Sequence, residues 1–241
     1  MAETNKEPVL RIERLEIRYG DFLAVQSASL SVREGTLVAL LGSNGAGKSS
    51  LLEAVAGLHA PSGGRVFFQG REITGQSPEK NLSLGLCLVP QGGKVFPRMS
   101  VEDNLLMGSY VKEARKREKE SLRYVYSLFP VLEEKRKDLC GTLSGGQRQM
   151  VAIGRAFMAR PKCLLFDEIS LGLAPVVMKD IYGAIRRINK EEGASVLLVE
   201  QDTSRVMSFV DECHVMQKGQ IVLSGPAREM TMERLKEAYL G

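Results

Sequence analysis

Hydrophobic and polar positions alternate in several short stretches of the chain. LEIRY (Leu15–Tyr19) and the stretch 28–32 alternate with a period of two, which predicts half-buried strands. GRVFFQGREI (Gly64–Ile73) predicts a hairpin that turns at its Gln-Gly pair, and HVMQKGQIVLSG (His214–Gly225) predicts another that turns at its Lys-Gly pair. Together these four segments predict an antiparallel layer.

Three other segments are apolar throughout. They are LVALL (Leu37–Leu41), CLLF (Cys163–Phe166) and SVLLV (Ser195–Val199). Unbroken apolar strands are typical of a parallel sheet that is covered on both faces. A helix is expected after the first of them, with one apolar face made of Leu51, Leu52, Val55 and Leu58, and IYGAIRRI (Ile181–Ile188) predicts a second helix. This alternation of strands and helices predicts a βαβ core.

Between about residues 92 and 160 the pattern becomes helical. Ser100 and Asp103 have the spacing of a capping box. The apolar face of one helix is expected to comprise Leu122, Val125, Tyr126 and Phe129. Pro161 is expected to end the last helix. We therefore predict one α/β domain over 1–241, with a catalytic core at about 1–91 and 161–241 and a helical subdomain at about 92–160.

The composition limits the classes of protein and of function that fit this chain. The 241 residues suffice for a full core, and the 44% hydrophobic and 26% charged content is ordinary for a globular domain. A net charge of +4 without a basic tail does not imply nucleic acid. The apolar runs are far shorter than the ~20 residues of a membrane helix, so any membrane role must come from partner chains. The first eight residues are polar and are expected to be frayed.

Two further features have simple interpretations. The run KEARKREKE (Lys112–Glu120) alternates in charge sign and predicts a solvated helix face. The four cysteines lie far apart in the sequence and form no C-x-x-C pair, which favours packed thiols in a reducing cytosol.

The segment GSNGAGKS (Gly42–Ser49) carries the strongest chemical signal. It matches G-x-x-x-x-G-K-[ST] after a buried strand and at the start of a helix. Its glycines let backbone N–H groups turn toward a phosphate, and the helix N-terminus adds partial positive charge. Lys48 is expected to reach the β- and γ-phosphates, and Ser49 to bind Mg²⁺. The expected nucleotide contacts are Gly42, Ser43, Asn44, Gly45, Ala46, Gly47, Lys48, Ser49 and Ser50.

The apolar strand CLLFDE (Cys163–Glu168) ends in two carboxylates. Acids at the end of a strand beside a phosphate loop can serve the metal and the attacking water. Asp167 is therefore the expected Mg²⁺ contact, and Glu168 the expected general base. On its own, the pair would more simply begin a polar loop.

The segment LSGGQRQ (Leu143–Gln149) precedes an amphipathic helix. Ser144 and the two glycines behind it provide a hydroxyl and open backbone amides, so the segment can form a second anion-binding helix N-terminus. The alternative is an ordinary N-cap with flexible glycines.

GSNGAGKSS, LSGGQRQ and LLFDE, in that order along the chain, resemble the nucleotide-binding domain of ABC (ATP-binding cassette) proteins, over nearly the whole chain. The resemblance implies a head-to-tail dimer in which each ATP lies between one subunit's phosphate loop and a segment of the other subunit. That segment comprises Ser144, Gly145, Gly146 and Gln147. The resemblance also implies that the helical subdomain faces a transmembrane partner.

The resemblance assigns further positions. Tyr19 stands where the family stacks an aromatic ring on adenine, with a buried strand tyrosine as the alternative. Gln91 stands where the family senses the γ-phosphate through Mg²⁺ or water, with a plain loop glutamine as the alternative. Residues 95–97 (Val-Phe-Pro) either help to form the groove for a partner's coupling helix or pack within the subdomain.

Closer matching points to one group of the family. VFPRMSVEDNL, GTLSGGQRQMVAIGRA, SLGLAP, LLVEQD and the ending KEAYLG resemble the shorter ATPase of Liv-type importers of branched-chain and other hydrophobic amino acids, which have urea importers as a sister group. Such a subunit is peripheral at the cytoplasmic face of the cell membrane. It works beside a second ATPase, two permeases and, indirectly, an extracytoplasmic solute-binding protein. The resemblance leaves a homodimer or a heterodimer open.

Several positions depart from the wider family. Gln201 stands where many members have histidine; its amide can donate to a γ-phosphate but carries no charge. Ala174 replaces the aspartate of the dimer-crossing loop, and both features recur in the Liv-type group. Ile169 replaces the usual proline and so adds a backbone N–H beside Glu168. His59 and His214 have no ligand-spaced neighbour and are expected to pack.

The expected function is ATP hydrolysis that powers an importer. One alternative keeps the fold without transport, as in ATPases that act on DNA or ribosomes, although those carry two cassettes or a long coiled coil. A small-molecule kinase is a second alternative, but it has no use for LSGGQRQ. A purely structural nucleotide-binding module is a third, which the intact Asp167-Glu168 pair disfavours.

Overall fold

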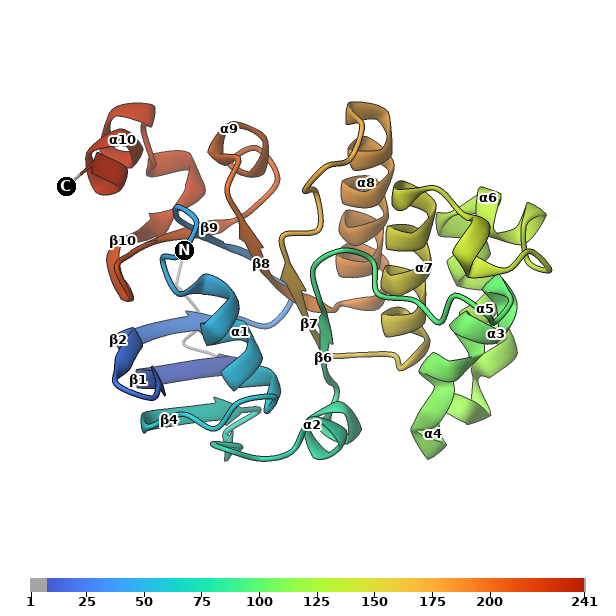
Figure 1. Cartoon of the computed structure of the whole chain (residues 1–241), viewed down its shortest axis with the longest axis horizontal. Coiled ribbons are helices and arrows are strands. Elements are labelled where there is room, and N and C mark those ends of the chain that lie inside the picture. Colours follow the sequence, from blue (N-terminus) through green and yellow to red (C-terminus); the bar gives the residue numbers. More distant parts are fainter. Residues whose placement is uncertain (1–7, 241) are drawn as a thin grey trace, which may run out of the picture.

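The computed structural model describes residues 8–240 and contains two β-sheets with helices between and around them (Figure 1). Most of the N-terminal stretch expected to be frayed lies in residues 1–7, outside the described residues. One sheet has four strands in the order β2-β1-β4-β5, and the other has six in the order β10-β9-β3-β8-β7-β6. The predicted α/β class with a separate antiparallel layer is confirmed.

The four-stranded sheet is antiparallel throughout and follows the alternating segments. Its strands are β1 (Leu10–Tyr19), β2 (Phe22–Val32), β4 (Gly63–Phe68) and β5 (Arg71–Glu72). Alternate residues of β1 are buried, as a strand with one covered face requires. The first predicted hairpin is confirmed, with Phe68 paired to Arg71 across the turn.

The six-stranded sheet is parallel except at one edge. Its strands are β3 (Leu37–Leu41), β6 (Leu86–Val89), β7 (Cys163–Asp167), β8 (Ser195–Glu200), β9 (Glu212–Gln217) and β10 (Gln220–Pro226). The three apolar segments form β3, β7 and β8, and they pair in parallel as predicted. The short strand β6 did not stand out in the sequence.

The second predicted hairpin forms, but its assignment to the antiparallel layer was wrong. The β9–β10 pair turns at Lys218 and Gly219 as expected, and β9 then pairs in parallel with β3, with Cys213 opposite Ala39. Residues Cys213–Met216 are all buried, so β9 is an interior strand that requires cover on both faces. The hairpin therefore extends the main sheet.

Five helices lie outside residues 92–160 of the described chain. They are α1 (Lys48–Ala56), α2 (Pro78–Leu84), α8 (Pro175–Glu192), α9 (Thr203–Val206) and α10 (Met232–Leu240), with a 3-10 turn at Ala227–Glu229. Helix α8 includes the second predicted helix. The expected place of Leu58 on the buried face of α1 was wrong. The helix ends at Ala56, Gly57 adopts a left-handed C-cap with φ 88°, and Leu58 is 59% exposed beyond it.

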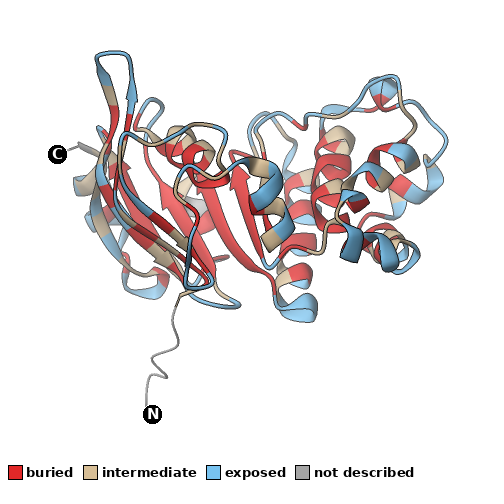
Figure 2. Cartoon of the chain, turned by 90° about the horizontal axis from the view of Figure 1, so that it is seen from below, coloured by how far each residue is buried: buried red, intermediate tan, exposed pale blue. Residues whose placement is uncertain are grey.

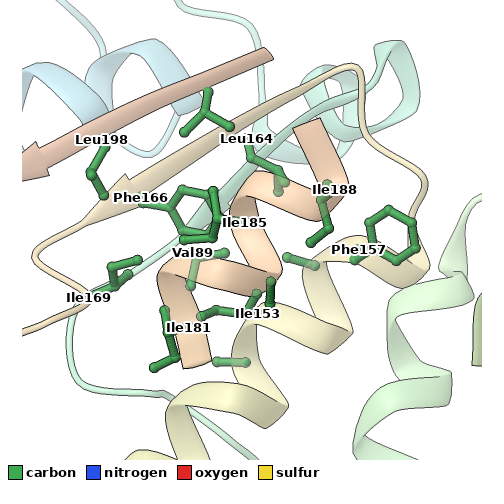
Figure 3. Close-up of a cluster of buried hydrophobic side chains, with 14 of the residues drawn as sticks. Val89, Ile153, Phe157, Leu164, Phe166, Ile169, Ile181, Ile185, Ile188 and Leu198 are labelled. Atoms are coloured by element: carbon green, nitrogen blue, oxygen red, sulfur yellow. The ribbon is translucent and has the colours of Figure 1, made fainter. Parts of the chain in front are cut away.

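Each central strand contributes to two hydrophobic cores. Val38 and Leu40 of β3 face α1 and the antiparallel sheet, whereas Leu37, Ala39 and Leu41 face α7 and α8. The same alternation in β7 places Leu164 and Phe166 against Ile181 and Ile185 of α8 (Figure 3). Figure 2 shows buried residues along the whole length of the central strands. Burial on both faces explains why these strands are apolar throughout.

Helices α3–α7 follow β6 and precede β7, and they lie at the end of the molecule opposite the antiparallel sheet (Figure 1). They are α3 (Val101–Leu106), α4 (Lys112–Lys116), α5 (Glu118–Leu128), α6 (Pro130–Glu134) and α7 (Gly145–Met158), with 3-10 turns at Met107–Tyr110 and Cys140–Thr142. The predicted cap is confirmed by Ser100 Oγ, which accepts from Asp103 N at 3.0 Å.

The other predictions about the helices between residues 92 and 160 also hold. Val125, Tyr126 and Phe129 are buried and Leu122 packs against them, and α7 ends before Pro161. The alternating charges are exposed except for half-buried Glu118, although the segment forms two short helices that meet at Arg117 instead of one face of one helix. The four cysteines are free thiols, and only Cys87 is not fully buried. Among residues 8–240, no helix is both long and apolar enough to cross a membrane.

Candidate active site

The phosphate loop connects the end of β3 to the start of α1. Gly45 and Gly47 have φ angles of 79° and 103°, in the left-handed region that glycine tolerates. A Cβ at Gly47 would lie 2.5 Å from the carbonyl oxygen of Ala24, and a Cβ at Gly42 would lie 2.3 Å from that of Met216. Gly42 is therefore required by close backbone approach, Gly45 by the turn, and Gly47 by both.

Lys48 occupies the centre of this loop. Its side chain is 3% exposed, and its ammonium donates to the carbonyl oxygens of Gly42 and Ser43 at 2.9 and 3.0 Å. The ammonium also lies 3.4 Å from Oε1 of Glu168. An ammonium with three nearby oxygens and little water is a concentrated positive charge at the mouth of the loop.

Ser49 and Asp167 meet at the carboxyl edge of the sheet. Ser49 Oγ donates to Asp167 Oδ1 at 2.9 Å, although the two residues are 118 positions apart. Burial raises the pKa of the Asp167 carboxyl, and the hydrogen bond from Ser49 acts in the opposite direction. A hydroxyl and a carboxylate in contact are the oxygen ligands that Mg²⁺ prefers.

Glu168 lies between two donors. Its Oε1 faces Lys48, and its Oε2 accepts from Gln91 Nε2 at 3.2 Å. The backbone of Glu168 has a φ of 44°, which is uncommon for a residue with a side chain. Its N–H donates to the carbonyl oxygen of Val199 in β8 at 3.0 Å. The side chain of Ile169, the residue that replaces proline, is buried against β8 and α8 (Figure 3).

A cavity of about 380 Å³ opens over the loop. It is lined by Tyr19, Phe22, Ala24, Asn44, Gly45, Ala46, Gly47, Lys48, Ser49, Ser50, Gln91 and Glu168. Tyr19 is 43% exposed and stacks on His59 with ring centroids 4.6 Å apart, so the alternative of a buried strand tyrosine was wrong. Phe22, which is 66% exposed, was missed, although it closes the same turn as Tyr19.

A second cavity, of about 280 Å³, shares Glu168 as part of its wall. Gln201 and Glu200 at the end of β8 line it together with the loop that follows Glu168. The structure thus brings Gln201 near Glu168. Ala174, which replaces the usual aspartate, is the N-cap of α8 and makes no side-chain cap bond.

The predicted anion-binding segment lies elsewhere. Ser144 caps α7, its Oγ accepting from Gln147 N at 3.2 Å, and Gln147 Oε1 accepts from Ser144 N at 3.0 Å. Ser144 and Gly145 are exposed, and neither they nor Gly146 and Gln147 line the cavity over the phosphate loop. The fold of a single chain therefore does not bring the two segments together.

The remaining predicted positions, in the segment 95–97 and at the two histidines, differ in how far their side chains are exposed. Val95 packs against the core, whereas Phe96 is exposed and lies under Arg155, with its N–H donating to Asn104 Oδ1 at 2.8 Å. His59 is half-buried against Tyr19, and His214 is buried in β9 with its Nδ1 2.8 Å from Ser224 Oγ. Both histidines therefore pack, as predicted.

The residues present fit ATP with a divalent cation. The cavity is lined by an exposed aromatic ring, Tyr19, and by the buried side chain of Lys48 with the residues of the phosphate loop. Close backbone contacts exclude side chains from Gly42 and Gly47, so the loop amides stay accessible to a phosphate. The Ser49–Asp167 pair supplies oxygen donors beside the ammonium.

Comparison with known proteins identifies a family. Residues 25–170 match the ABC transporter family. The high-affinity branched-chain amino acid transport ATP-binding protein BraG of Pseudomonas aeruginosa is 37% identical over 97% of this chain and 100% of its own length. The probable branched-chain amino acid transport ATP-binding protein LivF of Archaeoglobus fulgidus is 31% identical over 92% and 94%.

Solved structures agree with this result. A nucleotide-free ATP-binding cassette from an ABC transporter superposes with a TM-score of 0.80 at 29% identity, over 96% of this chain and 95% of that one. A dimeric bacterial ABC transporter cassette has a TM-score of 0.79 at 23% identity, over 92% and 100%, a likeness that shows the fold alone. The chain therefore belongs to the ABC transporter family, as one of its ATP-binding cassettes.

Proposed function

We propose that this chain is the ATP-hydrolysing subunit of an importer for branched-chain or other hydrophobic amino acids. The observation that carries the hydrolytic part is the position of Glu168, between the ammonium of Lys48 and the amide of Gln91 at the wall of the phosphate-loop cavity. The transport part is supported by relatives named as branched-chain amino acid transport ATP-binding proteins, which match the chain over nearly its whole length.

Each residue has a proposed role in hydrolysis. Tyr19 stacks on the adenine, while Lys48 and the amides of residues 42–50 hold the phosphates. Glu168 accepts a proton from the water that attacks the terminal phosphorus, and the bond from that phosphorus to the oxygen it shares with the neighbouring phosphate breaks, which releases ADP and inorganic phosphate. Gln91 and Gln201, which approach Glu168 from two loops, orient that water and donate to the terminal phosphate. Before substrate enters, the ion pair with Lys48 keeps the Glu168 carboxylate in place.

Mg²⁺ bound with the nucleotide neutralises phosphate charge. We infer that Ser49 and Asp167 would hold it, since they already form one contact beside the loop, and that Gln91, which lines the same cavity as Ser49, would contribute a further ligand. Asp167 has its pKa raised by burial, so a cation near this carboxylate offsets the energetic cost of its charge.

The second half of the site comes from another chain in this proposal. Ser144, Gly145, Gly146 and Gln147 form the N-terminus of α7, with Ser144 and Gly145 exposed, where a phosphate is stabilised by the helix dipole and by backbone amides outside the cap bonds. A head-to-tail dimer, homomeric or with a second ATPase, places this terminus over the partner's phosphate loop. Helices α3–α7 between about 92 and 160 form the subdomain that meets the transmembrane permeases, and residues 1–91 and 161–241 form the catalytic core.

In this proposal the chain itself is peripheral to the membrane. The chain docks on two permeases at the cytoplasmic face, and an extracytoplasmic binding protein delivers the solute. ATP binding closes the dimer, hydrolysis reopens it, and the permeases convert the two states into a change of access, because ligands act through a difference in affinity between states.

The decisive experiment on hydrolysis is Glu168→Gln in the full-length chain assembled with its partner subunits. We expect turnover to fall by about 100-fold or more, the usual contribution of a general base, while ATP binding stays within about twofold. A sedimentation measurement with ATP should show the variant as a trapped dimer. Parent-like turnover in this variant would remove Glu168 from the role of base.

The solute is tested separately. The complex is reconstituted in vesicles, and uptake of labelled leucine, isoleucine and valine is compared with uptake of labelled urea. ATP-dependent uptake of the amino acids supports the proposal, and uptake of urea alone replaces it with the sister function. If the chain purifies without any integral membrane protein, the alternative of an ABC ATPase outside transport takes precedence.

A further inference from the structure

Glu200 is a buried carboxylate at the end of β8. The residue is 3% exposed, and its carboxylate accepts three hydrogen bonds. Ser170 donates from its backbone N at 3.1 Å and from Oγ at 2.8 Å, and Tyr182 Oη donates at 3.2 Å. A carboxylate is an acceptor only, so three converging donors match its ionised form.

Two of the three donors belong to the loop that carries Glu168. This loop is fixed at three consecutive residues. The N–H of Glu168 is bonded to Val199, the side chain of Ile169 is buried in the core, and Ser170 is held twice by Glu200. The φ of 44° at Glu168 is a strained conformation that persists only where the surroundings hold it. Ser170 provides the polar anchor on the C-terminal side of Glu168.

The same residue adjoins the second catalytic loop. Glu200 directly precedes Gln201, and both line the cavity of about 280 Å³ whose wall includes Glu168. One side chain therefore connects the loop with the proposed base to the loop with the proposed γ-phosphate donor. Tyr182 ties this junction to α8, which packs against β7 and β8 through Ile181 and Ile185 (Figure 3).

We propose that Glu200 is a positioning residue for hydrolysis, which holds Glu168 in its strained conformation and in fixed relation to Gln201 by binding Ser170. The inference rests on the proposed hydrolytic function and deepens it. Glu200 does not touch the substrate in this scheme; it acts through the backbone and hydroxyl of Ser170. A displacement of only about 1 Å in a catalytic group can lower a rate by about 100-fold, so such an anchor has a large influence on turnover.

The charge of Glu200 lowers the stability of the folded chain, but it strengthens the hydrogen bonds that hold the loop of Glu168. Burial is the largest influence on Glu200 and raises its pKa, the bonds from Ser170 and Tyr182 act against it, and the charge of Glu168 adds to the rise. The ionised carboxylate is thus less favourable in the folded protein than in the unfolded chain. Hydrogen bonds to a charged acceptor are stronger than neutral ones, which benefits the loop.

These two effects separate in the variant Glu200→Gln. Glutamine keeps the size of the side chain and one acceptor oxygen for the Ser170 N–H and the Tyr182 hydroxyl, but it removes the charge. In the assembled ATPase we expect kcat to fall by about tenfold, as charge-assisted bonds become neutral ones. KM for ATP and the nucleotide Kd should stay within about twofold of the parent, and the Tm of the chain should be equal or higher.

A second variant tests whether Glu200 acts through Ser170. Ser170→Ala removes the hydroxyl bond, and kcat should again fall while nucleotide binding holds. The double variant Glu200→Gln with Ser170→Ala should be no slower than about twofold below the slower single variant, because coupled residues lose one shared contribution. Glu191→Gln is the matched control; Glu191 is an exposed carboxylate on the same helix as Tyr182, bonded to Tyr124 and Arg187, and its loss should leave kcat unchanged.

Parent-like kcat in both Glu200→Gln and Ser170→Ala would overturn the inference, as would fully multiplicative losses in the double variant. A lower Tm together with a lower kcat in Glu200→Gln would also overturn it, since the residue would then be a structural bond. These failures differ from failure of the proposed function. If the assembled parent hydrolyses no ATP, the function itself is wrong. If the parent is active and only Glu168→Gln is inactive, hydrolysis stands and the role of Glu200 alone is rejected.

Discussion

The phosphate loop and the N-terminus of α7 are built from similar residues but have opposite surroundings. Both combine glycines with a hydroxyl at the start of a helix. The phosphate loop is packed against β2 and β9, and its ammonium is 3% exposed and bonded within the chain. At α7, Ser144 and Gly145 face solvent, and their polar contacts are those of the cap.

This difference indicates which properties belong to one chain. The phosphate loop has its shape and its charges supplied by the fold, so nucleotide binding should be a property of the single subunit. The α7 terminus presents the first-turn backbone amides of Gly145 and Gly146, and none of its residues lines the cavity over the loop. Its contribution should therefore appear only when a second subunit is present. Substituting one glycine in the phosphate loop and one at the α7 terminus tests these two regions separately.

The largest effect is expected for Gly47→Ala. The new Cβ would lie 2.5 Å from the Ala24 carbonyl oxygen at a φ of 103°. Such strain amounts to about 1–3 kcal/mol, so the free energy of unfolding should fall by that amount. A loop that relieves this strain by leaving its phosphate-binding geometry must regain that geometry on binding, so the part of the strain relieved in the free chain lowers ATP affinity instead, by up to about 100-fold. Denaturant titration and nucleotide binding to the isolated chain measure both, and parent-like values for both would contradict the steric role of this glycine.

An intermediate effect is expected for Gly145→Asp. A Cβ at Gly145 meets no atom within 4 Å, and an acidic residue in the first turn suits the helix dipole. Stability and ATP binding of the isolated chain should therefore match the parent. In the assembled transporter, the added charge beside a phosphate should lower turnover by about tenfold or more. Gly145→Ala serves as the uncharged control. Reduced binding in the isolated chain would show that the terminus contributes within one subunit.

The smallest effect is expected for Tyr19→Ala, at the rim of the cavity. Stacking of a base on an aromatic side chain contributes about 1–3 kcal/mol, and the exposure of Tyr19 places it at the low end, so affinity should fall by about fivefold. Tyr19→Phe keeps the ring and should bind like the parent. Because stacking is insensitive to base identity, affinities for ATP and GTP should fall together; a loss confined to ATP would indicate hydrogen bonding instead.

Much of the fold was evident in the sequence. The runs at Leu37–Leu41, Cys163–Phe166 and Ser195–Val199 predicted parallel strands because burial on two faces leaves no position for a polar side chain. The short β6 and the place of the β9–β10 hairpin were not predicted. A four-residue edge strand has too few residues for a pattern, and a hairpin sequence specifies its turn but not the strand beside which it packs.

The candidate site shows the same division. Local motifs predicted roles for Lys48, Ser49, Asp167 and Glu168, since their chemistry depends on spacing along the chain. Glu200 and Ser170 carried no signal, because they are 30 residues apart and their partnership is visible only as contact. Phe22 was missed for a related reason: an exposed aromatic ring in a turn acquires meaning only from the cavity beside it.

By itself the sequence determined the phosphate loop, the acidic strand end and the family, because steric demands on glycine and the period of buried strands act over short distances. The tertiary structure alone decided that Ser49 meets Asp167, that Lys48 and Gln91 flank Glu168, and that Ser144 stays apart from them. Those arrangements depend on the order of strands in the sheet, which places the ends of β3, β7 and β8 side by side although the chain separates β3 from the other two by more than a hundred residues.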